Sequence, residues 1–140
     1  MEAKATWQSD MSFIGTANTG FEVRMDASEA SGGHNSGFRP TELLAMGTAG
    51  CTGMDVISIL RKKRAEVKGL EVRVHVDQAE TYPHVFTKMQ IEYVVTGHNI
   101  KRADVERAVE LSKEKYCPCI AMFKQVRSEE HTSELQSPNT

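Results

Sequence analysis

The stretch RPTELLAMGTAGCTGMDVISIL, from Arg39 to Leu60, decides how this chain folds. Pro40 stands where proline is favoured, at the first position of a helix. Apolar residues then recur around most of the helical circumference, which predicts a helix from Thr41 to Arg64 that is buried on most sides. At about 1.5 Å per residue, such a helix is long enough to cross a whole small domain.

Small residues interrupt the middle of this helix. Gly47, Gly50 and Gly53 recur at every third position around Cys51. Each glycine destabilises a helix interior by about 1 kcal/mol relative to alanine. Three of them predict that another backbone packs closely against this face. Cys51 is either a small apolar filler in that contact or a thiol that a second segment must approach.

Alternating segments flank the helix on both sides. Before it, three short strands are expected to form an antiparallel meander, followed by a glycine-rich loop. After it come a long β-hairpin, an amphipathic helix and one more short helix. The fold class is therefore α+β. The expected strands are Ala3–Trp7, Ser12–Ala17, Phe21–Asp26, Leu70–Gln78 and Phe86–Thr96, with a phase slip near Thr87, and the expected later helices are Lys101–Lys115 and Cys117–Gln125.

Composition narrows the class of protein. The 140 residues are 39% apolar and 26% charged, which indicates one globular domain. A net charge of −2 gives no electrostatic reason to expect binding to nucleic acid or to a membrane surface. No apolar run approaches the roughly 18 residues of a membrane span, and no signal peptide is expected. Three cysteines, an odd number, favour a reducing, cytoplasmic location.

The C-terminal residues differ from the rest. The segment VRSEEHTSELQSPNT has almost no apolar residues after Val126 and no period. We expect residues 127–140 to be a disordered, non-native tail, because the segment also looks like a translated sequencing-adapter sequence. The folded domain is then residues 1–126, and the tail cannot supply the alternating apolar face of a strand.

A second cysteine changes how Cys51 is interpreted. Cys117 lies in the segment KYCPC at the start of the last helix, where the helix dipole and Lys115 are expected to lower its thiol pKa. Cys51 and Cys117 could therefore form a reversible pair. Cys117 and Cys119 could be half of a metal site, but no other cysteine and no histidine pair completes it, so we expect no metal and no cofactor. Cys119 should point elsewhere, because side chains at i and i+2 of a helix do not share a face.

These residues together resemble the OsmC/Ohr family of thiol peroxidases and their uncharacterised relatives. The resemblance covers about residues 3–126 and is most specific in the long helix, in the hairpin around YPHVFTKMQIEYVVTG and in KYCPCIAMF. It implies an OsmC-like fold of two intertwined subunits, a homodimer whose long helices pack together with the active sites at the interface. It also implies that Cys51 is the peroxide-attacking thiol and Cys117 the resolving thiol, and that an external dithiol, such as a lipoylated protein, reduces the product.

The supporting charges depart from the pattern of the characterised hydroperoxide reductases. Those enzymes carry an arginine in the first turn and a glutamate at the start of the long helix. Here the first turn is QSD, and the nearest carboxylate is that of Glu42, one position later. Arg39 or Arg24 could replace the missing arginine, and we take Arg39 and Glu42 as the supporting residues. The chain is thus similar to the uncharacterised branch rather than to the proven reductases.

The expected function is thiol-dependent reduction of organic hydroperoxides by a two-cysteine mechanism. Such a peroxidase is an antioxidant oxidoreductase of the stress response. The alternative is a non-catalytic OsmC-like dimer that binds an apolar ligand or senses oxidants. A structural or interaction protein with inert thiols is a third class.

Overall fold

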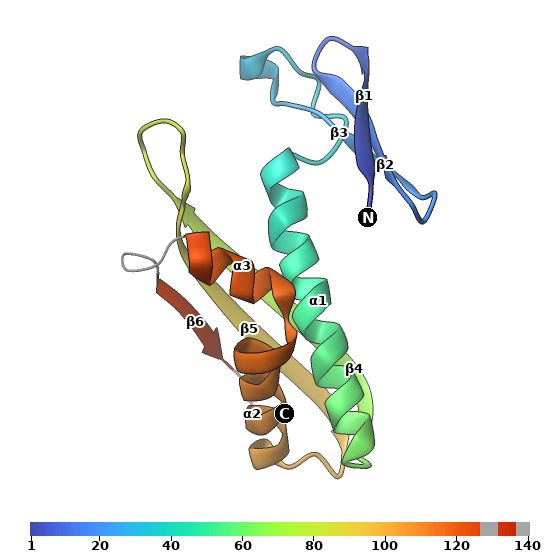
Figure 1. The fold of residues 1–140 in the computed structure, drawn as a ribbon, viewed down its shortest axis with the longest axis vertical. Coiled ribbons are helices and arrows are strands. Elements are labelled where there is room, and N and C mark those ends of the chain that lie inside the picture. The colour runs from blue at the N-terminus through green and yellow to red at the C-terminus, as the bar shows by residue number, and fades with distance from the viewer. Residues whose placement is uncertain (127–131, 137–140) are drawn as a thin grey trace. The chain divides into compact units, whose positions relative to one another are not determined.

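The computed structural model describes residues 1–126 and 132–136, and it divides the chain into two compact units (Figure 1). The first unit is Met1–Leu44 and the second is Ala45–Thr140, where the sequence predicted a single domain. Each unit has its own three-stranded sheet, and no strand of one sheet is hydrogen-bonded to a described strand of the other.

The first unit is built on an antiparallel meander, as the sequence predicted. Its strands are hydrogen-bonded in the order β1-β2-β3, with Trp7 paired to Phe13 and Phe13 to Met25. Tight turns join the strands because Asp10 and Gly20 adopt positive φ angles of 49° and 87°. The elements are β1 (Ala3–Ser9), β2 (Ser12–Ala17), β3 (Glu22–Met25) and the short 3₁₀ helix η1 (Glu29–Ser31).

Asp26 organises the glycine-rich loop that follows β3. Its side chain is 2% exposed, and its carboxylate accepts hydrogen bonds from the backbone N–H groups of Ala27 (2.7 Å) and His34 (3.1 Å). The N–H and hydroxyl of Ser36 also donate to it, at 3.1 and 2.6 Å. The Ser36 hydroxyl and the Ala27 N–H outweigh the effect of burial and hold the pKa of Asp26 well below its usual range. The loop also passes so close to the preceding chain that a Cβ on Gly33 would lie 2.1 Å from the Ala27 carbonyl oxygen.

Replacing Asp26 with Asn should destabilise the first unit at neutral pH, because an amide cannot accept this set of donors. The folded-state pKa of Asp26 lies below the unfolded-state value, so its stabilisation is complete above that value and fades as the pH falls. The difference in melting temperature between wild type and Asp26→Asn should therefore narrow below about pH 4. Thermal unfolding at several pH values measures this. Asp77→Asn, at an exposed site, is the control, and equal melting temperatures at pH 7 would contradict the assignment.

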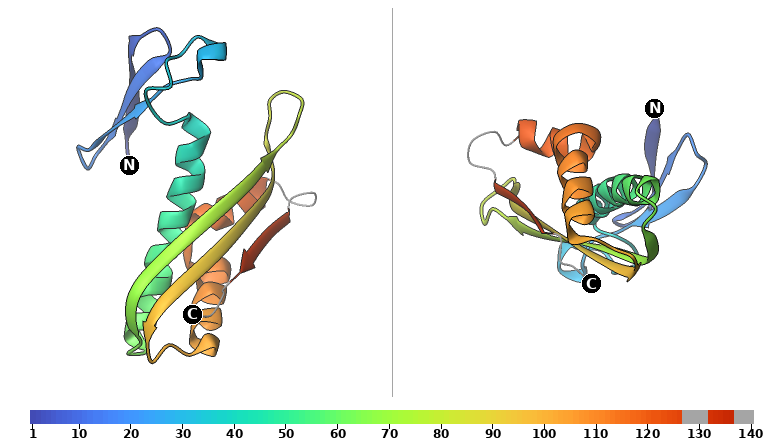
Figure 2. Two further views of the ribbon diagram at one scale, coloured as in Figure 1. Left: turned by 180° about the vertical axis from the view of Figure 1, so that it is seen from behind. Right: turned by 90° about the horizontal axis from the view of Figure 1, so that it is seen from below.

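The second unit packs helices on one face of a long hairpin (Figure 2). Fully buried Val56 and Leu60 of the long helix meet buried side chains of the second hairpin strand, among them Tyr93. The ring of Phe123 stacks on Phe86 at 5.7 Å between centroids, which seats the last helix on the same strand. The elements are α1 (Pro40–Lys62, which begins in the first unit), β4 (Glu66–Gln78), β5 (Phe86–His98), α2 (Arg102–Leu111), the π-helical turn η2 (Ser112–Tyr116), α3 (Pro118–Val126) and β6 (Thr132–Gln136).

The hairpin follows the predicted alternation with one irregularity where the phase slips. Met89, Ile91 and subsequent alternate residues of β5 are buried, and the other phase is less so. Asp77 pairs with Lys88 while Gln78 pairs with Phe86, so Thr87 is an extra residue in the register. This bulge explains why the sequence alternation breaks near Thr87.

The strand β6 differs from the expectation of an unpaired tail. Thr132–Gln136 pairs with β5 in parallel, Lys88 opposite Thr132 and Glu92 opposite Gln136. An alternating apolar face is not required for this pairing, because the free edge of β5 offers main-chain donors and acceptors to any extended segment. The remainder of the predicted tail, residues 127–131 and 137–140, lies outside the described residues.

By length and composition alone, α1 is apolar enough to cross a membrane. The central helix of a globular protein meets the same criterion. Here one face of α1 is buried against the core of the second unit. Its buried positions include the small polar residues Thr48 and Thr52 as well as Val56 and Leu60.

Candidate functional site

Cys51 lies in the middle of α1 on the side that faces the core. It is a free thiol, half-buried, and packs against the buried cluster of the second unit. A helical residue in the centre of a long element is held rigidly, so the position of its sulfur is set by the packing of α1. This is the setting that a thiol needs if another cysteine must meet it repeatedly.

Cys117 is the N-cap residue of α3. Its backbone is extended, with φ −81° and ψ 108°, and Pro118 follows at the first helical position. The Ile120 N–H points at the Cys117 sulfur at 3.5 Å, so the side chain caps the helix. The Cys117 N–H donates to the Ser112 carbonyl at 2.8 Å, which fixes the other side of the residue. Only 2% of Cys117 is exposed.

The fold brings all three cysteines together. Cys51 and Cys119 both pack against the buried cluster that includes Cys117, and the Cys51 thiol adds to the raised pKa of the other two. That Cys51 and Cys117 form a reversible pair stays a prediction. The prediction that Cys119 points elsewhere is wrong. The rule for i and i+2 positions applies within a helix, whereas Cys117 is an extended cap residue, so its side chain is not bound by helical spacing.

The electrostatics of the resolving position also differ from the prediction. Burial raises the pKa of the Cys117 thiol to about 12, against the opposing hydrogen bond from the Ile120 N–H. The expected lowering by the helix start is thus outweighed, and Lys115 is not among the causes of the shift; its Nζ lies over the Tyr116 ring, 5.3 Å from the ring centre. Burial likewise raises the pKa of Cys119, with Cys51 adding to the rise and the Thr48 hydroxyl opposing it.

A chain of buried hydroxyl groups lies directly beside the cysteines. Thr52 Oγ1 is 2.7 Å from Tyr93 OH and 2.7 Å from Ser112 Oγ. Ser112 Oγ in turn donates to Asp55 Oδ2 at 2.8 Å. Because Asp55 takes the single Ser112 proton, Thr52 donates to Ser112 and Tyr93 donates to Thr52. The first three residues are fully buried, and burial raises the pKa of Tyr93 to about 12.

This hydroxyl chain links the elements that carry the thiols. Thr52 follows Cys51 in α1, and Ser112 begins the turn whose carbonyl holds the Cys117 N–H. The Thr52–Ser112 bond therefore fixes the spacing between α1 and the segment leading to Cys117. Sequence reasoning missed this set. The only signal in the sequence was that helical periodicity places Thr52 and Ser112, two polar residues, on the buried side of their helices.

Thr52→Val should test the hydroxyl chain, because valine keeps the shape and removes the hydroxyl. The Tyr93 and Ser112 hydroxyls then lose a buried partner, which should lower the free energy of unfolding by about 1–3 kcal/mol. Chemical denaturation measures the change. Thr96→Val, at an exposed position of β5, is the matched control. If the two variants are equally stable, the chain does not hold these elements together.

The predicted supporting residues have a structural role at the start of α1. The Arg39 N–H donates to Glu42 Oε1 at 2.7 Å, and the Glu42 N–H donates to the Arg39 carbonyl at 2.9 Å. Glu42 thus reaches back from the third helical position to the cap residue, as in a capping box. The Arg39 guanidinium also donates to the Asn35 side chain. Both residues belong to the first unit and Cys51 to the second, so their support of the thiol stays a prediction.

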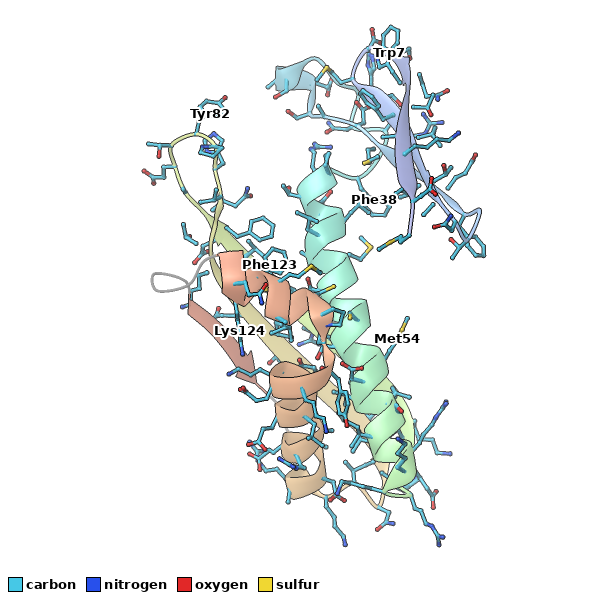
Figure 3. All side chains as sticks on the ribbon, in the orientation of Figure 1. Trp7, Phe38, Met54, Tyr82, Phe123 and Lys124 are labelled. Carbon is cyan, nitrogen blue, oxygen red and sulfur yellow. The ribbon has the colours of Figure 1, made fainter. Side chains whose placement is uncertain are left out.

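The opposite face of α1 is open. A Cβ added to Gly47 or Gly50 would meet nothing within 4 Å, whereas one on Gly53 would lie 3.3 Å from a Val72 methyl group. Met54 is 75% exposed and projects from α1 on the side away from α2 and α3 (Figure 3). Among the described residues, the predicted close approach of another backbone is therefore not seen: Gly53 meets a side chain, and Gly47 and Gly50 meet nothing. A groove lined by Gly50, Met54, Ile57 and residues 67–70 runs along this face.

The chain is similar to proteins of known sequence and structure. Residues 33–129 match a family described as OsmC-like protein. Protein YhfA of Escherichia coli (strain K12) is 35% identical over 138 residues, covering 96% of this chain and 98% of YhfA. The crystal structure of a hypothetical protein from Aquifex aeolicus superposes with a TM-score of 0.81 at 30% identity, covering 99% of this chain and 96% of that one. An organic hydroperoxide resistance protein from Elizabethkingia anophelis shares the fold, with a TM-score of 0.70 at 16% identity, covering 99% and 94%.

Proposed function

The chain belongs to the OsmC-like protein family, and on that premise we propose that it reduces organic hydroperoxides with a pair of cysteines. The observation that carries the proposal is that two free cysteines distant in sequence share one packed cluster, in which Cys51 lies against the buried core that includes Cys117. The printed name of one structural neighbour, an organic hydroperoxide resistance protein, supports the choice of substrate class.

In the first step, the thiolate of Cys51 attacks the terminal oxygen of the peroxide. A sulfur–oxygen bond forms and the oxygen–oxygen bond breaks, so the peroxide leaves as an alkoxide that takes up a proton to become an alcohol. Cys51 is oxidised to a sulfenic acid. A thiolate is required because the protonated thiol is a poor nucleophile.

In the second step, Cys117 attacks the sulfur of the Cys51 sulfenic acid. A disulfide forms, the sulfur–oxygen bond breaks, and hydroxide leaves with the proton of the Cys117 thiol as water. Because burial raises the pKa of Cys117, its thiol must give up its proton to the leaving hydroxide as the sulfur attacks. Cys117 is then a poor direct competitor for peroxide.

An external dithiol closes the cycle by exchange with the disulfide. A lipoylated protein is the partner class that the family resemblance suggests. The reaction belongs to a reducing compartment, and we place it in the cytoplasm. Arg39 and Glu42 remain the proposed supporting charges, in addition to their role in capping α1.

Thiol titration before and after one equivalent of cumene hydroperoxide tests the proposal. Wild type should lose two thiols per chain and regain them on addition of a dithiol, because both thiols enter the disulfide. Cys51→Ser should lose none, since the attacking atom is gone. A wild type that keeps all its thiols on the same timescale would reject the enzyme and favour the non-catalytic alternative.

We also propose that the protein is a homodimer through the open face of α1. The free space at Gly47 and Gly50, together with exposed Met54, supports a close contact with a second copy. Burial of this apolar face would repay the helical cost of the glycines.

Gly50→Leu should abolish the dimer, because the added side chain enters space that is empty in one chain and filled by the partner in the assembly. Sedimentation at micromolar concentration should show a dimeric wild type and a monomeric or unfolded variant. Glu106→Leu adds the same side chain to an exposed position of α2 and should leave the dimer intact. A monomeric wild type of ordinary stability would contradict the proposal.

A further inference from the structure

We propose that Cys119 is a second redox partner of Cys51, able to form a Cys51–Cys119 disulfide in competition with Cys117. The inference deepens the proposed function and rests on it for the peroxide step. It starts from the packing of Cys51 and Cys119 against the same buried cluster that contains Cys117, so the Cys51 thiol lies among both thiols of the segment Cys117-Pro118-Cys119.

Cys119 is more accessible to solvent than Cys117. Cys119 is half-buried, while Cys117 is 2% exposed. The hydroxyl of Thr48, which lies about one turn before Cys51 in α1, interacts with the Cys119 sulfur. This hydroxyl opposes the rise that burial and Cys51 cause in the pKa of Cys119. Cys119 therefore combines partial exposure with a place in the same packed cluster as Cys51.

The chemistry needs no reagent beyond those of the proposed function. The Cys119 sulfur attacks the sulfur of the Cys51 sulfenic acid, forming a sulfur–sulfur bond and breaking the sulfur–oxygen bond. Hydroxide leaves and takes the thiol proton, so water is released. Cys119 is oxidised to the disulfide level and the sulfenic sulfur is reduced to it.

A disulfide to Cys119 would be more accessible to an external reductant than one to Cys117. An external dithiol must reach one sulfur of the disulfide, and the buried Cys117 sulfur is the least accessible of the three. A disulfide between Cys51 and Cys119 joins two half-buried residues. The Cys117 thiol then stays in the core as the helix cap while the oxidised pair faces the reductant.

The test compares wild type with Cys117→Ser, Cys119→Ser and the double variant. Each is treated with one equivalent of cumene hydroperoxide in the presence of dimedone and then mapped by peptide mass spectrometry. Cys117→Ser should still lose two thiols and yield the Cys51–Cys119 peptide pair. Only the double variant should accumulate a dimedone adduct on Cys51. If Cys117→Ser instead accumulates that adduct at the level of the double variant, Cys119 is not a partner.

A second oxidant separates this inference from the proposed function. Diamide couples neighbouring thiols without passing through a sulfenic acid, so it reports pairing even if peroxide does not react. A Cys51–Cys119 disulfide with diamide but no reaction with peroxide would overturn the peroxidase and keep the pairing. Peroxide turnover that yields only Cys51–Cys117 in wild type and in Cys119→Ser, with no Cys51–Cys119 pair in Cys117→Ser under either oxidant, would keep the peroxidase and overturn the pairing. Circular dichroism checks each variant, and Cys117→Ala replaces Cys117→Ser if the serine unfolds the core.

Discussion

The hydrogen bond between Thr52 and Ser112 is the interaction on which the site depends. It joins α1, which carries Cys51, to the π-helical turn that ends at Cys117, and both residues are fully buried. A buried hydroxyl without a partner is costly, so the two elements are held at one spacing rather than sliding as two apolar surfaces can. Tyr93 and Asp55 extend the same constraint to β5 and to the protein surface. The cysteine cluster is thus placed by polar groups within an otherwise apolar core.

The two faces of α1 divide the remaining tasks. Val56 and Leu60 bury the inner face against β5 and α2, and this packing supplies the apolar core of the second unit. The outer face presents Gly47, Gly50 and Met54, and no described residue of the chain covers the two glycines. A helix with glycines in its centre is intrinsically weak, so the inner face must stabilise it enough to leave the outer face open. In our account, a second copy covers that outer face.

The spacing of apolar residues along the sequence predicted the helix α1 and the hairpin strands β4 and β5. The periodicity of α1 and the alternation of β4 and β5 were readable, including the slip that became the bulge at Thr87. The membership in the OsmC-like family confirmed the resemblance. The hydroxyl chain was not readable, because Thr52 and Ser112 are 60 positions apart and each looks like an ordinary helix residue. The raised pKa of Cys117 and the direction of Cys119 also escaped, since burial and the extended cap backbone are properties of the assembled fold.

The central claim is that the cysteine cluster converts a hydroperoxide into an alcohol. A single-turnover experiment tests it most directly: fully reduced protein is mixed with one equivalent of cumene hydroperoxide, and the alcohol product is quantified by chromatography. The account predicts one alcohol per chain, formed together with a protein whose mass is lower by two hydrogen atoms. Recovery of unreacted peroxide alongside protein of unchanged mass would contradict it.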